Sequence, residues 1–199
     1  MSLARPGGNL TGVHMFAGPE IWGKNLQILK EAVPSVSRAA FLTTRTVVED
    51  DRQLREASRR LAISLTPMLL EEVTRSRIEQ AFADTAQDRP DAIIVSATGE
   101  LLPYRQLIVE LVEKSRLPAM YAWREYVEAG GLMAYAGDVG ELSRRMADDV
   151  HEILRGARPG YIPIYRPTRY ELVINLKAAK ALGLALPPTL LALADEVIE

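Results

Sequence analysis

Short apolar runs alternate with helical stretches up to Gly137, and this alternation constrains the fold more than any other feature of the chain. Apolar runs predict strands at residues 10–16, 36–43, 63–70, 91–96, 118–122 and 132–135. Helical periodicity predicts helices at residues 19–33, 47–61, 75–87 and 102–115. The continuous apolar centre of Asp91–Ser96 is typical of a parallel strand that is covered on both faces. The alternation therefore predicts right-handed βαβ units and an α/β fold with a doubly wound parallel sheet.

The pattern changes after Gly137. A long helix is expected from Asp138, its N-cap, to Gly156. Its apolar stripe consists of Leu142, Met146, Val150 and Ile153. An extended segment, a strand at 170–174 and a short helix at 176–182 are expected to follow. We therefore expect an α/β domain at residues 1–137 and a tail of helical and extended segments at residues 138–199.

The sequence contains few of the residue patterns that are typical of catalytic, metal or cofactor sites. It has no cysteine, and its only histidines, His14 and His151, have no partner at metal-ligand spacing. Phosphate-binding glycine loops and nucleophile elbows are also missing from the sequence. The net charge of -2 argues against a nucleic-acid partner, and no apolar run reaches the ~18 residues of a membrane span. The residues therefore predict no enzyme, cofactor, metal, nucleic-acid partner or membrane span.

Polar and aromatic residues gather where the predicted strands end. The carboxyl ends of parallel strands share one rim of a sheet, which is where open α/β sheets bind small ligands. The free N–H groups after Thr98 and the guanidinium of Arg124 could hold a carboxylate, and Asp138 could meet an ammonium. Aromatic side chains of the rim could flank an apolar or aromatic group. The candidate ligand-binding residues are Ser96, Thr98, Trp123, Arg124, Tyr135 and Asp138.

With these residues in place, the chain resembles the substrate-binding proteins of ABC transporters with the type I periplasmic fold, in the branch associated with aromatic amino acids. The matching segments are Ala4–Val13, Leu29–Pro34, Leu117–Tyr121, Arg124–Met133 and Tyr170–Gly183. They extend along nearly the whole chain, with order and spacing kept. The resemblance implies a fold of two α/β lobes that close on a ligand.

The motif Arg5–Asn9 usually lies where such chains cross into the second lobe. The resemblance therefore implies that this chain corresponds to the second lobe and the returning segments, without a signal peptide and most of the first lobe. It implies a location in the periplasm, or anchored by lipid outside the inner membrane; a complete gene product without a signal peptide would be cytoplasmic. An ABC permease is the implied protein partner.

The leading hypothesis is a small-molecule binding component of an ABC-type uptake system, in a shortened form, with an amino acid or similar small organic acid as ligand. The alternative is a non-catalytic ligand-sensing or dimerisation domain of the same fold. An enzyme of flavodoxin-like shape ranks third, since no phosphate loop supports it. In the absence of a first lobe, the apolar stripe of the helix after Asp138 is expected to be covered by a second copy of the chain, which predicts a homodimer.

Overall fold

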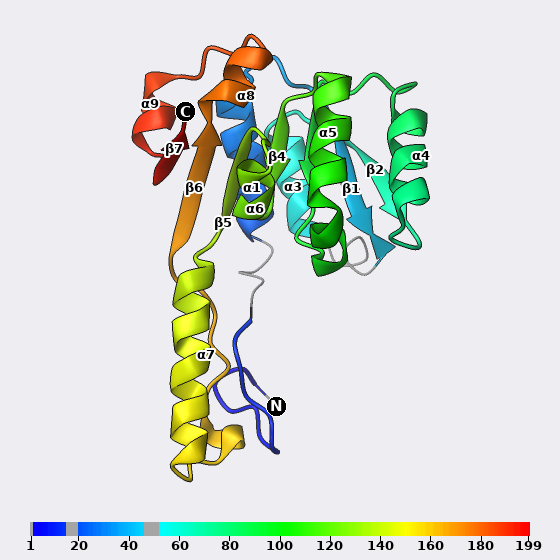
Figure 1. The fold of residues 1–199 in the computed structure, drawn as a ribbon. Coiled ribbons are helices and arrows are strands. Elements are labelled where there is room, and N and C mark those ends of the chain that lie inside the picture. Colours follow the sequence, from blue (N-terminus) through cyan, green and yellow to red (C-terminus); the bar gives the residue numbers. More distant parts are fainter. Residues whose placement is uncertain (1, 15–19, 46–51) are drawn as a thin grey trace. The chain divides into compact units, whose positions relative to one another are not determined.

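A computed structural model describes residues 2–14, 20–45 and 52–199, and a seven-stranded sheet lies at its centre (Figure 1). The strand order across the sheet is β2-β1-β3-β4-β5-β6-β7. Each pairing with a described register is parallel: β1 with β2 and β3, β3 with β4, β4 with β5, and β6 with β7. The strands are β1 Arg38–Thr44, β2 Ser64–Leu70, β3 Ala92–Val95, β4 Ala119–Tyr121, β5 Met133–Gly137, β6 Tyr170–Asn175 and β7 Glu196–Ile198. The predicted α/β fold with a mostly parallel sheet is confirmed.

Helices cover both faces of this sheet. Figure 1 shows α4 and α5 on one face and α1 and α3 on the other. The described helices are α1 Glu20–Ala32, α3 Arg52–Arg60, α4 Arg75–Thr85, α5 Arg105–Ser115, α6 Arg124–Glu128, α7 Val139–Leu154, α8 Leu176–Ala181 and α9 Pro188–Ala192. Two 3-10 helices, η1 Gly99–Tyr104 and η2 Pro159–Tyr161, precede α5 and follow α7. The predicted strand–helix alternation is therefore present from α1 to β5.

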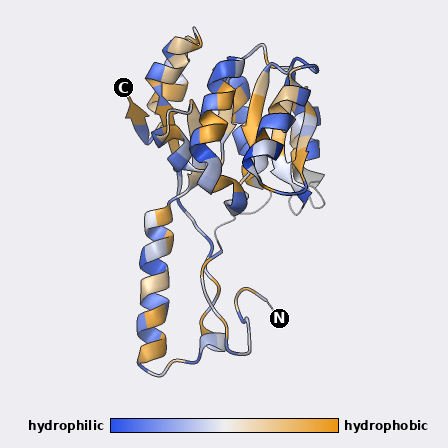
Figure 2. Ribbon diagram, turned by 45° about the vertical axis from the view of Figure 1, so that its right-hand side comes forward, coloured by the Kyte–Doolittle hydropathy of each residue, from blue (hydrophilic) through white to orange (hydrophobic). Residues whose placement is uncertain are grey.

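Burial explains why the central strands read as continuous apolar runs. All four residues of β3 are buried, and Figure 2 shows the strands as predominantly hydrophobic. On one face, Ile78 and Phe82 of α4 and Ile108 of α5 pack into the same hydrophobic cluster as the strands. On the other face, Trp22 of α1 meets Phe41 of β1 edge to face, with ring centroids 5.3 Å apart.

The amino ends of β1 and β3 are joined by one carboxylate. Asp91 Oδ2 accepts hydrogen bonds from the Ser37 hydroxyl at 2.8 Å and from the backbone N–H groups of Ser37 and Arg38 at 3.1 and 2.9 Å. The Ser37 hydroxyl is the main cause that lowers the pKa of Asp91 to about 2, and these N–H groups add to the effect. The charged carboxylate thus holds the start of β1 beside the start of β3.

The chain divides into two compact units, Met1–Gly18 with Gly137–Tyr170, and Pro19–Ala136 with Glu171–Glu199. This division differs from the split predicted after residue 137. The chain does leave the sheet at α7, but the residues after Tyr170 return to it as β6, α8, α9 and β7. Asp195, directly before β7, binds Leu172 of β6 twice. Its N–H donates to Leu172 O at 2.9 Å, and its carboxylate accepts from Leu172 N at 2.9 Å.

The first predicted strand is wrong over its described part. Residues 10–14 contribute only an isolated bridge between Val13 and Tyr165, in the unit that contains α7, and residues 15 and 16 lie outside the described part of the chain. In the same unit, Gly7 N–H donates to Gly160 O at 3.1 Å, and Thr11 Oγ1 donates to Ile162 O at 2.8 Å. Residues 10–14 therefore pair with the extended segment after α7 instead of joining the sheet.

Helix α7 begins where the sequence predicts. Asp138 is its N-cap and accepts from the Glu141 N–H at 3.0 Å. Asp149 is buried in this unit, 3.0 Å from the guanidinium of Arg145, which also lies over the ring of Tyr165. None of the helices that the structure describes has both the length and the hydropathy that a membrane crossing requires.

Candidate functional site at the carboxyl ends of the strands

Three hydroxyl groups meet where β1 and β3 end. The hydroxyls of Ser96 and Thr98 lie 2.9 Å apart, and the hydroxyl of Thr44 lies 3.4 Å from that of Thr98. All three residues are buried. The register pairs Leu42 with Val95, and Ser96 N–H donates to Leu42 O at 3.0 Å, so the two strand ends are level with each other. We call Thr44, Ser96 and Thr98 the hydroxyl cluster.

Thr44 directly follows the predicted strand at residues 36–43 but was not a predicted site residue. Its contact with Thr98 spans 54 positions of the sequence, so only the pairing of β1 with β3 brings the two together. A threonine as the last residue of a central strand was the available signal. Three hydroxyls can each donate and accept, so the cluster can bind a carboxylate, a carbonyl or an ammonium.

The segment after Thr98 differs from the predicted helix. Gly99–Tyr104 forms the 3-10 helix η1, and α5 begins only at Arg105. Leu101 N–H already donates to Thr98 O at 3.1 Å. The chain after Thr98 is thus 3-10 before it becomes α-helical, and the hydroxyl cluster is a further polar feature at this strand end.

Trp123 follows the neighbouring strand β4. The register pairs Val95 with Tyr121, so Thr98 and Trp123 follow the ends of adjacent parallel strands. Trp123 is only 8% exposed, and its indole N–H has no hydrogen-bond partner among the described residues. The next turn, α6, is held by stacking of Tyr126 on Tyr121, with ring centroids 4.9 Å apart. Trp123 is therefore part of the packed core as well as of the rim.

Arg124 is engaged by carboxylates of its own chain. Its guanidinium lies 2.9 Å from Glu128, 2.8 Å from Glu196 and 3.5 Å from Glu171. The hydrogen bonds to Glu128, the larger cause, and to Glu196 raise the pKa of Arg124. One positive charge among three carboxylates leaves a local surplus of negative charge. This geometry favours a role in holding α6, β6 and β7 together over the predicted role as partner of a ligand carboxylate.

The last two predicted residues lie further along the chain. Tyr135 is half-buried in β5, and its burial, followed by the charge of Asp195, raises its pKa. Asp138 belongs to the unit that contains α7, where it caps that helix and lies 3.7 Å from Arg144. Its carboxylate is thus used locally. Among the described residues, no group of three or more histidine, aspartate or glutamate side chains could hold a metal ion.

Comparison with known proteins adds a family and a fold. A family model described as ABC transporter substrate binding protein matches residues 1–198. A tyrosine-binding protein of Clostridioides difficile is 20% identical over 186 residues, which cover 92% of this chain and 52% of that protein. The chain thus spans about half the length of this curated relative.

Two solved structures share the fold closely. A conserved domain protein from Vibrio cholerae superposes with a TM-score of 0.87 at 23% identity, over 98% of this chain and 65% of its own length. An ABC domain from Streptococcus pneumoniae, solved in complex with L-Trp, superposes with a TM-score of 0.85 at 23% identity, over 100% of this chain and 68% of its own length. At this level of identity the likeness is one of fold.

Proposed function

Because the chain belongs to the family of ABC transporter substrate-binding proteins, we propose that it binds a small molecule, an amino acid or similar small organic acid, for an ABC-type uptake system. The match of the family model over residues 1–198 carries this proposal. The relatives support the ligand class, because one is a tyrosine-binding protein and another was solved with L-Trp. Aromatic amino acids are therefore the first ligands to test.

The proposed ligand-facing residues are Ser96, Thr98, Trp123 and Tyr135. The hydroxyl cluster supports this choice because it offers donors and acceptors in a buried setting. The nearby aromatic rings can pack against an apolar or aromatic side chain. Arg124 acts as a positioning residue, through its ion pairs with three glutamates.

Asp138 stays in the proposal as a residue that orients the start of α7, because its carboxylate caps that helix. The proposed protein partner is the permease of an ABC transporter, and the proposed location is outside the cytoplasmic membrane, as for the family. The chain acts by recognition in this proposal, with no chemical step of its own.

We expect Thr98→Val to weaken binding of L-tyrosine or L-tryptophan by about five- to tenfold, the effect of losing one hydrogen bond. Valine keeps the shape of threonine but removes the hydroxyl that links Ser96 to Thr44. Isothermal titration calorimetry against all common amino acids measures the effect, and aromatic ones should bind more tightly than aliphatic ones.

Thr189→Val is the matched control, because Thr189 is exposed at the start of α9 in the same unit. It should leave affinity unchanged within twofold. If no amino acid binds at millimolar concentration, the proposed ligand class is wrong. If binding occurs but Thr98→Val leaves it intact, the ligand lies away from the hydroxyl cluster.

We further propose a homodimer through the apolar stripe of α7. Of the stripe, Leu142 is buried and Ile153 is half-buried, but Met146 and Val150 are 49% and 51% exposed, and the adjacent Leu154 is 82% exposed. Figure 2 shows hydrophobic residues recurring along this helix. A contiguous apolar stripe on a surface helix is typical of a protein–protein contact. A second copy of the chain is the proposed cover, because a symmetric pair of such helices buries both stripes at once.

Replacing both Met146 and Val150 by glutamate should raise the dimer dissociation constant on the order of tenfold or more, since like charges would then face each other. Arg155→Glu makes the same charge change of two units at the C-cap of α7. At ~100° per residue, this position is on the side of the helix opposite Met146. This variant should leave the dimer intact. Light scattering at micromolar concentration measures the mass, and a monomeric unmodified chain would contradict the proposal.

A further inference from the structure

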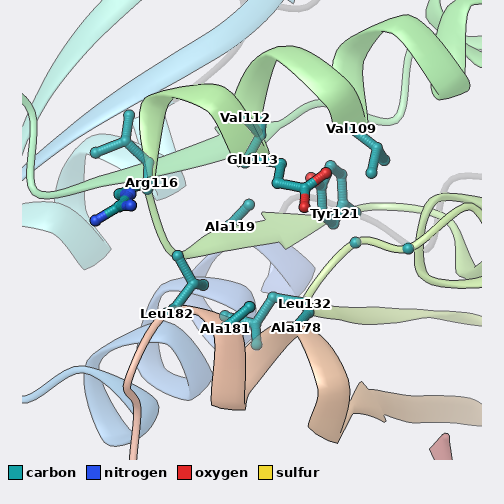
Figure 3. A pocket seen from close by; sticks show the side chains of 13 residues that line it. Val109, Val112, Glu113, Arg116, Ala119, Tyr121, Leu132, Ala178, Ala181 and Leu182 are labelled. Atoms are coloured by element: carbon teal, nitrogen blue, oxygen red, sulfur yellow. The ribbon is translucent and has the colours of Figure 1, made fainter.

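A cavity of about 280 Å³ lies in the sheet unit between α5, the start of β4 and α8 (Figure 3). Ala119 is the first residue of β4 and Leu132 immediately precedes β5, so the cavity begins at the amino ends of these parallel strands and extends along β4 to Tyr121. None of its lining residues is a proposed site residue. The hydroxyl cluster and Trp123 are at the opposite, carboxyl ends. The cavity is therefore separate from the proposed amino-acid site, and the inference drawn from it does not rest on that site.

Small residues keep this space open. Gly130, Gly131, Ala119, Ala178 and Ala181 contribute to its walls, where larger side chains would fill it. Apolar cavities of about 150 Å³ are known to hold a benzene ring, so this cavity has room for a ring with a short substituent. Val112, Leu132 and Leu182 add apolar side chains to a lining that is polar in about equal part.

A polar group without a partner lies at the Gly131 wall. A Cβ added to Gly131 would lie 2.5 Å from Cε2 and 3.0 Å from Cζ of Tyr121, so the hydroxyl-bearing end of the ring is next to this wall. Tyr121 is 1% exposed, and its hydroxyl has no hydrogen-bond partner among the described residues. Burial, followed by the neighbouring Tyr126, raises the pKa of Tyr121, so this hydroxyl stays a neutral donor.

Two side chains of opposite charge lie at the edge of the cavity and do not pair with each other. Glu113 and Arg116 are exposed at the end of α5, and within the described chain neither side chain forms an ion pair. Figure 3 shows their charged groups on separate sides of Ala119, with Ala181 at the end of α8 and the following residue Leu182 across from them. A carboxylate and a guanidinium that do not pair with each other at the edge of this cavity can each bind a group of opposite charge.

We propose that this cavity is a second ligand site, for a small zwitterion with an apolar body. The carboxylate of the ligand pairs with Arg116, its ammonium pairs with Glu113, and its apolar body enters the space between Ala119, Leu132 and Ala181. An amino acid or a short peptide has this chemistry. The Tyr121 hydroxyl lies beside the cavity as a further donor.

Three probes with the same ring separate the contributions: L-phenylalanine has both charges, 2-phenylethylamine only the positive one and 3-phenylpropionate only the negative one. Methyl NMR spectra of the full chain report the site directly, through Val112, Leu132 and Leu182 in the cavity walls. L-phenylalanine should shift these signals at the lowest concentration. Arg116→Gln should weaken L-phenylalanine and 3-phenylpropionate by up to about fivefold, the limit for an exposed ion pair, and spare 2-phenylethylamine.

Glu113→Gln should show the converse pattern. Ala181→Trp fills the cavity from an exposed position of α8 and should weaken all three probes by tenfold or more. Lys177→Trp introduces the same indole at an exposed position of the same helix outside the cavity and should change affinity less than twofold. Thr98→Val should leave the cavity signals unaffected, which separates this site from the proposed amino-acid site.

The proposal is overturned if none of the probes shifts the cavity methyl signals at millimolar concentration. It is also overturned if Ala181→Trp leaves those shifts unchanged, or if Arg116→Gln and Glu113→Gln weaken all probes equally. A folded Ala181→Trp variant is recognised by an otherwise unchanged spectrum. If that variant does not fold, the two glutamine variants at exposed positions still decide the question.

Discussion

Replacing Trp123 by alanine should lower the free energy of unfolding by about 3–5 kcal/mol, the range for large aromatic side chains removed from a core. The indole is 8% exposed and packs in the hydrophobic cluster formed by β3, β4, α4 and α5. Trp123 also directly precedes α6, whose first residue, Arg124, forms ion pairs with three glutamates. Urea unfolding followed by far-ultraviolet circular dichroism measures the change.

Trp123→Phe is the matched variant, and it should cost only about 1–2 kcal/mol. It keeps an aromatic ring in the cluster and removes an indole N–H that has no partner within the described residues. An alanine variant as stable as the unmodified chain would contradict the packing of Trp123. A phenylalanine variant that folds but loses amino-acid binding would show that the indole also serves the ligand.

Replacing Gly131 by alanine should destabilise the chain by about 2–3 kcal/mol, as expected for an overpacked core. The added Cβ would lie 2.5 Å from Cε2 of Tyr121 and 2.8 Å from the backbone oxygen of Tyr126. The Tyr121 ring is buried and stacked on Tyr126, so neither neighbour can move without breaking other contacts. Gly131 N–H also donates to Tyr126 O at 2.8 Å, which fixes the approach of the two segments.

Gly99→Ala is the control, because a Cβ at Gly99 would meet nothing within 4 Å. It should change the free energy of unfolding by less than about 0.5 kcal/mol, as for ordinary surface substitutions. In a Tyr121→Leu background the penalty of Gly131→Ala should shrink, since the ring that it strikes is gone. An unchanged penalty there would place the clash at the Tyr126 backbone instead of the ring.

Local periodicity carried the sequence-based prediction of the sheet. The buried run of β3 and the amphipathic pattern of α5 each occupy contiguous residues, so their secondary structure is expressed in short windows of sequence. The same holds for the N-cap of α7, where Asp138 lies three positions before the N–H that it accepts. The family resemblance was equally readable, because its motifs are contiguous segments.

Contacts between segments that are distant in the sequence could not be predicted from sequence patterns. The run at residues 10–16 has the composition of a strand, but Val13 bridges to Tyr165, and composition cannot name that partner. The final strand β7 has only three residues and none of them is buried, so it shows no apolar run. It pairs in parallel with β6, and two hydrogen bonds between Asp195 and Leu172 support this pairing.

The sequence by itself determined the α/β alternation, the family and the location of polar residues at strand ends. Only the tertiary structure decided which of these residues are used by the chain itself. Arg124 meets Glu171 and Glu196 across 47 and 72 positions, and Thr98 meets Thr44 across 54. Strand order and register determine such partners, and both arise from packing of the whole sheet. They produce no periodic pattern in the sequence, so sequence periodicity could not predict these contacts.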